Sequence, residues 1–244
     1  LHGSVQSALR AQNADGFGGA LPPEFLLRAL AHSSLSWKDM GRAAQVCVAF
    51  RSALRPGLTA AFAMRLCSTD DNTCRQAVQQ LYKYADYIPR ATPLWPKFES
   101  LIPHLVKLLA SGRAEHTRVK AAETLEYLCE NNKGSYMEEA MVAAGGAAAL
   151  LHMISAGTVK EREYATGAIE YLSCAPIKPT HHAEMKKWRL RVDAIVTAGG
   201  ISVLCSVLSE LSSETPDAGT QAHPSPILEV LKDIARFAHH RPAM

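Results

Sequence analysis

Apolar residues recur at helical spacing in three segments of the chain that align without gaps. Each segment contains an alanine, at Ala77, Ala121 and Ala165, and these alanines follow one another at a period of 44 residues. Apolar side chains stand four and seven places after each alanine, at Leu81 and Tyr84, Leu125 and Leu128, and Ile169 and Leu172. An i, i+4, i+7 pattern puts one apolar stripe on a helix, with alanine where a neighbouring helix crosses closely. The pattern therefore predicts three equivalent amphipathic helices.

Two further elements recur between these helices. The segment 105–112 matches 150–157, and we expect Gly112 and Gly157 to end their helices in a left-handed C-terminal cap. A glycine pair also recurs, at 145–146 and 199–200, where a short helix should end and the chain should turn sharply. Each unit is thus a short helix, a Gly-Gly corner, a middle helix and a longer amphipathic helix, which predicts an all-α fold.

The order and length of these elements resemble the armadillo repeat over about residues 75 to 240. The segments 102–109 (IPHLVKLL), 121–128 (AAETLEYL) and 142–146 (VAAGG) carry the resemblance. It implies a right-handed superhelical armadillo-like α-solenoid, in which each repeat contacts its neighbours. We expect repeats at about 58–97, 98–140, 141–187 and 188–244, interrupted by inserted loops near 175–187 and 209–226.

The resemblance also implies where a partner would bind, because the third helices of an armadillo array line its concave groove. The outward positions lie two, six and nine places after each alanine: Gln79, Lys83, Asp86, Glu123, Tyr127, Glu130, Gly167, Tyr171 and Cys174. Tyr127 and Tyr171 share one rung, so they form either an aromatic ladder that holds a peptide or ordinary surface packing on the next repeat. The Trp and Asn pairs of nuclear-import receptors are absent, so we do not expect a receptor for basic nuclear signals.

The N-terminal region has a different pattern. Residues 1–20 contain four glycines and no sustained periodicity, which predicts a flexible tail or linker. Residues 21–57 resemble an F-box, whose helices dock the adaptor subunit of cullin-type ubiquitin ligases. By this resemblance the docking residues would be Leu21, Pro22, Leu26, Leu30, Val46 and Phe50. The alternative is a helical cap that shields the first apolar face of the solenoid.

A basic stretch surrounds one tryptophan at the end of the first expected insertion. Its residues are Lys186, Lys187, Trp188, Arg189 and Arg191. Such a basic loop could meet an acidic partner or a phosphate backbone. The alternative is a solvated connector in which Trp188 only anchors the returning helix.

Composition and charge narrow the class of protein. The formal net charge of the 244 residues is +3, which argues against a dedicated nucleic-acid binder. The six cysteines form no CxxC pair, which predicts reduced thiols in an intracellular protein, cytoplasmic or nuclear. No apolar run is long enough to span a bilayer. The sequence begins at Leu1 rather than Met, so the question of whether an organelle-targeting segment precedes it stays open.

No motif for catalysis, a cofactor or a metal is present in the sequence. There is no glycine-rich phosphate loop, HExxH or EF-hand loop, and the adjacent pairs His181–His182 and His239–His240 are poor metal ligands. We therefore expect a non-enzymatic protein-interaction module without a cofactor, whose partner is a protein. Two roles stay open: the substrate-recognition subunit of a cullin-type ubiquitin ligase, or a scaffold subunit of a cytoskeletal, axonemal or organellar assembly.

Overall fold

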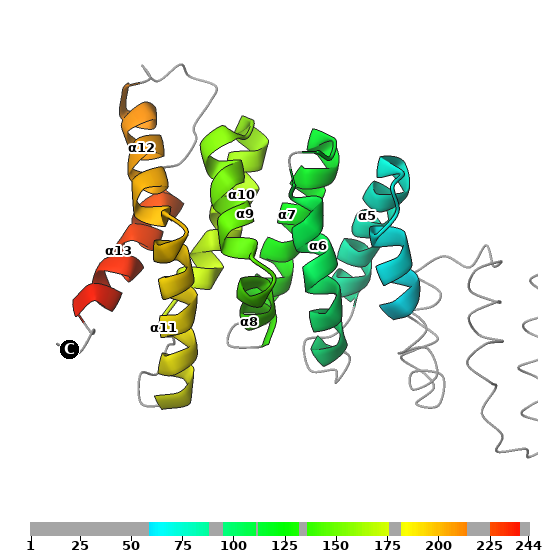
Figure 1. Ribbon diagram of the computed structural model, residues 1–244, viewed down its shortest axis with the longest axis horizontal. Coiled ribbons are helices and arrows are strands. Elements are labelled where there is room, and N and C mark those ends of the chain that lie inside the picture. The colour runs from blue at the N-terminus through cyan, green and yellow to red at the C-terminus, as the bar shows by residue number, and fades with distance from the viewer. Residues whose placement is uncertain are drawn as a thin grey trace, which may run out of the picture. The chain divides into compact units, whose positions relative to one another are not determined.

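A computed structural model describes residues 59–87, 95–110, 112–131, 136–175, 182–213 and 225–239 of the chain (Figure 1). The chain divides into two compact units, Leu1–Phe62 and Ala63–Met244. The second unit holds nearly all of the described residues. The F-box-like segment and its docking residues lie outside the described residues.

Helices are the only regular secondary structure in the described ranges, which confirms the predicted all-α class there. After a helical stretch at 59–66, the elements are α5 (Asp71–Tyr87), the 3-10 helix η1 (Trp95–Leu101), α6 (Ile102–Leu108), α7 (Glu115–Asn131), α8 (Tyr136–Ala143), α9 (Gly146–Ala156), α10 (Val159–Ser173), α11 (His182–Thr197), α12 (Gly200–Ser213) and α13 (Ser225–His239). Within this part of the chain, no single helix combines the length and the apolar character that a membrane span requires.

The long helices pack against one another in chain order. Helix α7 packs between α5 and α10, and α10 also packs against α9 and α13 (Figure 1). Ala77, Ala121 and Ala165 are fully buried, as are the apolar residues four places later and the leucines at 128 and 172. Alanine at the crossing points lets the helix backbones approach closely, and the 44-residue pattern therefore marks the core of this unit.

The glycine pairs form the corners that their spacing predicts. Gly145 and Gly199 adopt φ angles of 79° and 83°, a left-handed conformation that favours glycine. The glycine that follows each of them is buried: a Cβ on Gly146 would lie 2.5 Å from Cγ of Met141. The chain turns through 75° between α8 and α9, and through 65° between α11 and α12. The first glycine permits the turn, and the second lets the next helix start against the previous one.

The prediction of left-handed caps at Gly112 and Gly157 is wrong. Among the described residues the positive φ angles belong to Gly145 and Gly199 alone, and Gly157 is extended with φ −84° and ψ 168°. Gly157 is instead required by close approach, because a Cβ there would overlap the carbonyl oxygen of Met153 and lie 2.8 Å from Cβ of Glu161. The next residue, Thr158, begins α10 with a capping box.

The inserted segments are shorter than the sequence predicted. Helix α11 begins at His182, so residues 182–187 are helical rather than looped. Likewise α12 continues to Ser213 and α13 begins at Ser225, which places 209–213 and 225–226 in helices. The stretch before Trp188 is rich in Ala, Glu, Met and Lys, which are strong helix formers, so its polarity marks an exposed helical turn.

Candidate partner-binding face

Five glutamates gather where α10 crosses α7, and we refer to them as the Glu126 cluster. They are Glu123, Glu126 and Glu130 on α7, and Glu163 and Glu170 on α10. Glu126 is half-buried and lies directly over Gly167 of α10. A Cβ on Gly167 would overlap Oε1 of Glu126 and lie 2.6 Å from its Cδ. The missing side chain at position 167 therefore makes the room that the Glu126 carboxyl occupies.

The position of Glu126 changes its acidity. Burial raises its pKa from 4.5 to about 7, and the negative charges of the other four glutamates add to the effect. Burial disfavours the charged carboxylate because water is removed, and like charges disfavour it further. At neutral pH this carboxyl is therefore close to half-protonated, and a cation placed beside it would favour the ionised form.

Two tyrosines border the Glu126 cluster. Burial raises the pKa of Tyr171 to about 12, and the charges of Glu130 and Glu126 contribute. Burial likewise raises the pKa of Tyr164, with contributions from Glu123 and Glu163. Both phenols therefore stay protonated at neutral pH and offer an aromatic ring beside carboxylates. Carboxylates and aromatic rings in one place are the groups that lysine and arginine side chains contact.

The structure places the predicted groove residues in different environments. Gln79, Lys83 and Glu130 are exposed, as the outward positions require. Glu123 is half-buried and forms an ion pair with Lys120 one turn earlier. The side chain of Asp86 lies outside the described residues.

Tyr127 and Tyr171 are both half-buried. The ring of Tyr127 packs on Tyr82 of α5, with the ring centroids 4.8 Å apart and the planes tilted by 48°. Tyr127 thus joins α7 to the preceding long helix, while Tyr171 lies among the glutamates. The equal spacing put these two tyrosines on one rung, either as an aromatic ladder or as ordinary surface packing, and the structure gives them different neighbours.

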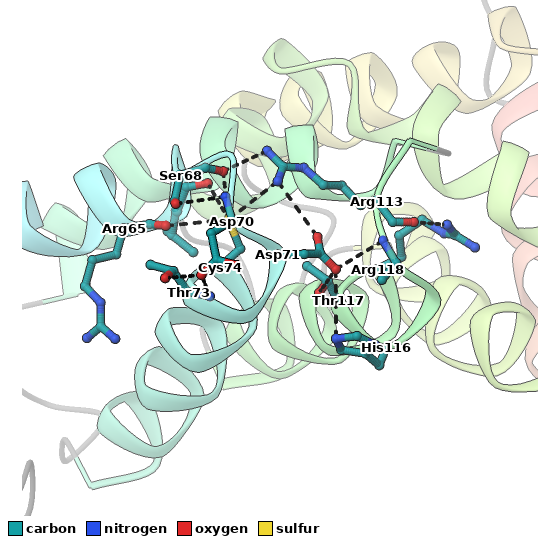
Figure 2. A network of polar contacts seen from close by, with 12 residues as sticks. Arg65, Ser68, Asp70, Asp71, Thr73, Cys74, Arg113, His116, Thr117 and Arg118 are labelled. Atoms are coloured by element: carbon teal, nitrogen blue, oxygen red, sulfur yellow. Dashed lines mark hydrogen bonds and ion pairs between the residues drawn. The ribbon is translucent and has the colours of Figure 1, made fainter.

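A seam of polar contacts joins the N-terminal ends of the long helices (Figure 2). Oδ2 of Asp71 accepts hydrogen bonds from the backbone N–H of Ala114 at 3.2 Å and from the hydroxyl of Thr117 at 2.9 Å. One unit further on, Oε1 of Glu115 accepts a hydrogen bond from the hydroxyl of Thr158 at 2.9 Å. Asp71 and Glu115 each begin a long helix, so an acidic side chain in the same position joins each long helix to the next unit.

Two arginines strengthen the same seam. Arg113 donates to the carbonyl of Ser68 at 3.1 Å and lies 3.8 Å from Asp71 (Figure 2). Arg118 pairs with the buried Glu161 at 2.5 Å. The seam was not predicted from the sequence, although its signal was present: Asp71 and Glu115 are separated by the same 44 residues as the alanines.

The basic stretch on α11 is largely structural. Trp188 is 1% exposed and donates from Nε1 to the carbonyl of Ser173 at 2.7 Å. Arg191 is 6% exposed and donates to the carbonyls of Leu172 and Cys174 at 3.1 and 3.2 Å. These carbonyls belong to the C-terminal end of α10, where cations and donors are favourable. Trp188 therefore anchors α11, as the second of the two alternatives predicted, and Arg191 is buried rather than part of an exposed basic loop.

The rest of the basic stretch divides between packing and exposure. Nζ of Lys187 lies 3.8 Å from Glu139 and 4.4 Å from the centroid of the Tyr136 ring. Arg191 also reaches Glu139, at 3.3 Å. Lys186 and Arg189 are exposed. The surface that a phosphate backbone could meet is accordingly much smaller than the sequence suggested.

Within the described ranges, no group of three or more His, Cys, Asp or Glu side chains is arranged to hold a metal ion. No protein-family model and no curated protein matches the chain. It is similar to the crystal structure of an engineered protein, at 18% sequence identity and a TM-score of 0.48. That match covers 86% of this chain and 57% of the engineered protein, so this chain spans little more than half of its neighbour's length. A match at this level carries no argument about fold or function.

Proposed function

We propose that this chain is a non-enzymatic protein-interaction module that binds a lysine- or arginine-rich segment of a partner on the α7–α10 face. The observation that carries the proposal is the Glu126 cluster, whose central carboxyl is held half-buried among four other glutamates. A basic side chain placed there would relieve the repulsion between the carboxylates and would pack against Tyr164 or Tyr171.

The proposal includes an armadillo-type superhelix as the framework of the module. Its support is the 44-residue recurrence of buried alanines, together with glycine corners that recur before α9 and α12. The proposed mode of binding differs from that of nuclear-import receptors. Because the Trp and Asn pairs are absent, charge and tyrosine contacts would select the partner segment. A crystal structure in which one right-handed rotation relates successive units would support the framework.

The binding test uses a fluorescein-labelled oligo-lysine peptide and the full chain, followed by fluorescence anisotropy. We expect saturable binding that weakens as salt is added, and no binding of an oligo-glutamate peptide of the same length. Glu130→Gln removes one exposed charge from the cluster and should weaken binding about threefold to tenfold, equivalent to about 0.6–1.4 kcal/mol.

The matched control is Glu184→Gln, which removes one exposed glutamate charge from α11, outside the cluster. Its affinity for oligo-lysine should stay within about twofold of the unchanged chain. Equal weakening by both substitutions would mean that the peptide senses only net charge. Equal affinity for the basic and the acidic peptide would contradict the proposal.

A narrower role, as the substrate-recognition subunit of a cullin-type ubiquitin ligase, rests on the F-box-like sequence of residues 21–57. Affinity capture of the tagged chain beside a Leu26→Asp, Leu30→Asp variant tests it. Recovery of a ligase adaptor and a cullin by the unchanged chain alone would support this role. Recovery of one stoichiometric assembly by both chains, without the ligase, would support the scaffold role instead.

A further inference from the structure

A cysteine and a histidine from different parts of the second unit meet at its surface. Cys67 follows the helical stretch at 59–66 and is an exposed free thiol. Its Sγ lies 3.1 Å from Nδ1 of His104 on α6, which is 37 residues further along the chain. This distance is well inside the range for a hydrogen bond that involves sulfur, so the thiol and the imidazole form a hydrogen-bonded pair.

The state of the imidazole determines which partner donates the proton. Burial lowers the pKa of His104, and the positive charge of Lys107 lowers it further. The ring is therefore mostly neutral at neutral pH, so Nδ1 can accept the proton of the thiol while Nε2 carries its own. A thiol becomes a good nucleophile when it loses its proton, and an adjacent base can accept that proton.

Three other cysteines of the described ranges differ from Cys67. Cys74 and Cys129 are buried, and burial raises the pKa of both thiols. Cys205 on α12 is exposed like Cys67. The thiol of Cys67 contacts an imidazole, whereas at Cys205 the backbone carbonyl accepts a hydrogen bond from the hydroxyl of Ser209. Exposure alone therefore does not separate Cys67 from Cys205, but the histidine does.

We propose that Cys67 is a modification site, at which His104 activates the thiol for oxidation by hydrogen peroxide. Nδ1 takes the thiol proton, and the sulfur attacks one peroxide oxygen. The S–O bond forms as the O–O bond breaks, and the departing hydroxide takes the proton back from the imidazolium to leave as water. The sulfur loses two electrons, the peroxide gains two, and the products are Cys67 sulfenic acid and water. This inference is independent of the proposed basic partner, because neither residue belongs to the Glu126 cluster.

The test treats the full, reduced chain with hydrogen peroxide, traps sulfenic acid with dimedone, and quantifies each cysteine by mass spectrometry. Cys67 and Cys74 share one tryptic peptide, so fragment ions must separate them. We expect Cys67 to be labelled at least about tenfold faster than Cys205 in the same molecule, since general-base assistance commonly exceeds that factor. Equal rates at the two cysteines would overturn the proposal without the need for any variant.

Two substitutions assign the effect to His104. His104→Gln retains a polar side chain but removes the base, and should bring the Cys67 rate to within about twofold of the Cys205 rate. His152→Gln makes the same change at an exposed position of α9 and should leave the Cys67 rate unchanged. Circular dichroism checks that each variant is folded. A folded His104→Gln chain in which Cys67 still reacts at its original rate would refute the role of the imidazole.

Discussion

Gly167 of α10 lies directly beneath the carboxyl of Glu126 of α7, so close that a Cβ at position 167 would overlap Oε1 of Glu126. This relationship explains how a glutamate comes to be half-buried at a helix crossing. A larger residue at 167 would push the carboxyl toward water, where it would ionise at its ordinary pKa. The acidity of the Glu126 cluster is thus set by a residue without a side chain.

The first prediction concerns Gly167→Ala. The new methyl group meets the end of a flexible side chain, so Glu126 should rotate outward rather than force the two helices apart. We expect the pKa of Glu126 to fall from about 7 toward 4.5. The free energy of unfolding should stay within about 1 kcal/mol, because alanine also favours the helix. A side-chain carbon NMR titration measures the pKa directly, and a value that stays near 7 would contradict this account.

The second prediction is a pH dependence of stability that originates at Glu126. Its pKa is raised in the folded chain, so the folded state binds more protons than the unfolded state between pH 4.5 and about 7. The contribution of Glu126 to stability is therefore present in full below pH 4.5 and is lost as the pH rises through 7. Glu126→Gln removes this titration and should stabilise the chain at pH 8 by about 1–3 kcal/mol.

Urea unfolding of both chains at pH 4.5 and pH 8 measures this effect. Burial also raises the pKa of other carboxyls, Glu99 and Asp233 among them, and the two chains share these groups. The comparison is therefore the difference between the two chains at each pH, in which the shared groups cancel. A difference that is the same at both pH values would show that Glu126 does not titrate as described.

The third prediction tests the role of Arg191 at the end of α10. Arg191→Ala removes donors from the carbonyls of Leu172 and Cys174 and one of the two cations beside Glu139, so it should lower the free energy of unfolding by about 2–4 kcal/mol. Lys186→Ala, at an exposed position on the same helix, should change the stability by less than about 0.5 kcal/mol. Thermal unfolding of both variants makes the comparison. Equal small effects would mean that the basic stretch is solvated throughout.

The sequence predicted the features that depend on local periodicity. The buried stripe of α7 follows from the spacing of Ala121, Leu125 and Leu128, and the corner at Gly145 follows from the glycine pair. These signals are local because a helix repeats every 3.6 residues and a left-handed turn favours glycine.

Features that depend on which side chains meet across helices could not be predicted in this way. Glu126 and Gly167 are far apart in the sequence. A glycine inside the helical pattern of α10 indicates a close approach there, but it does not show which side chain approaches. The basic residues of α11 gave a misleading signal, because charge alone does not show that Arg191 lies against the last carbonyls of α10. The seam at Asp71 could have been found, since its acidic position repeats with the alanines.

The last prediction separates two glycines that the sequence treated alike as points where a helix ends. Gly145→Ala places a side chain at a φ of 79°, which should cost about 1–2 kcal/mol even though the space around it is open. At Gly112 a Cβ would also meet open space, and its φ lies outside the left-handed region, so Gly112→Ala should be neutral or slightly stabilising. Urea unfolding of the two variants beside the unchanged chain gives both values. Because the added methyl group has room at both positions, any difference between them measures the cost of the left-handed backbone alone. Equal free energies of unfolding for the two variants would mean that the chain can turn between α8 and α9 without a left-handed conformation at position 145.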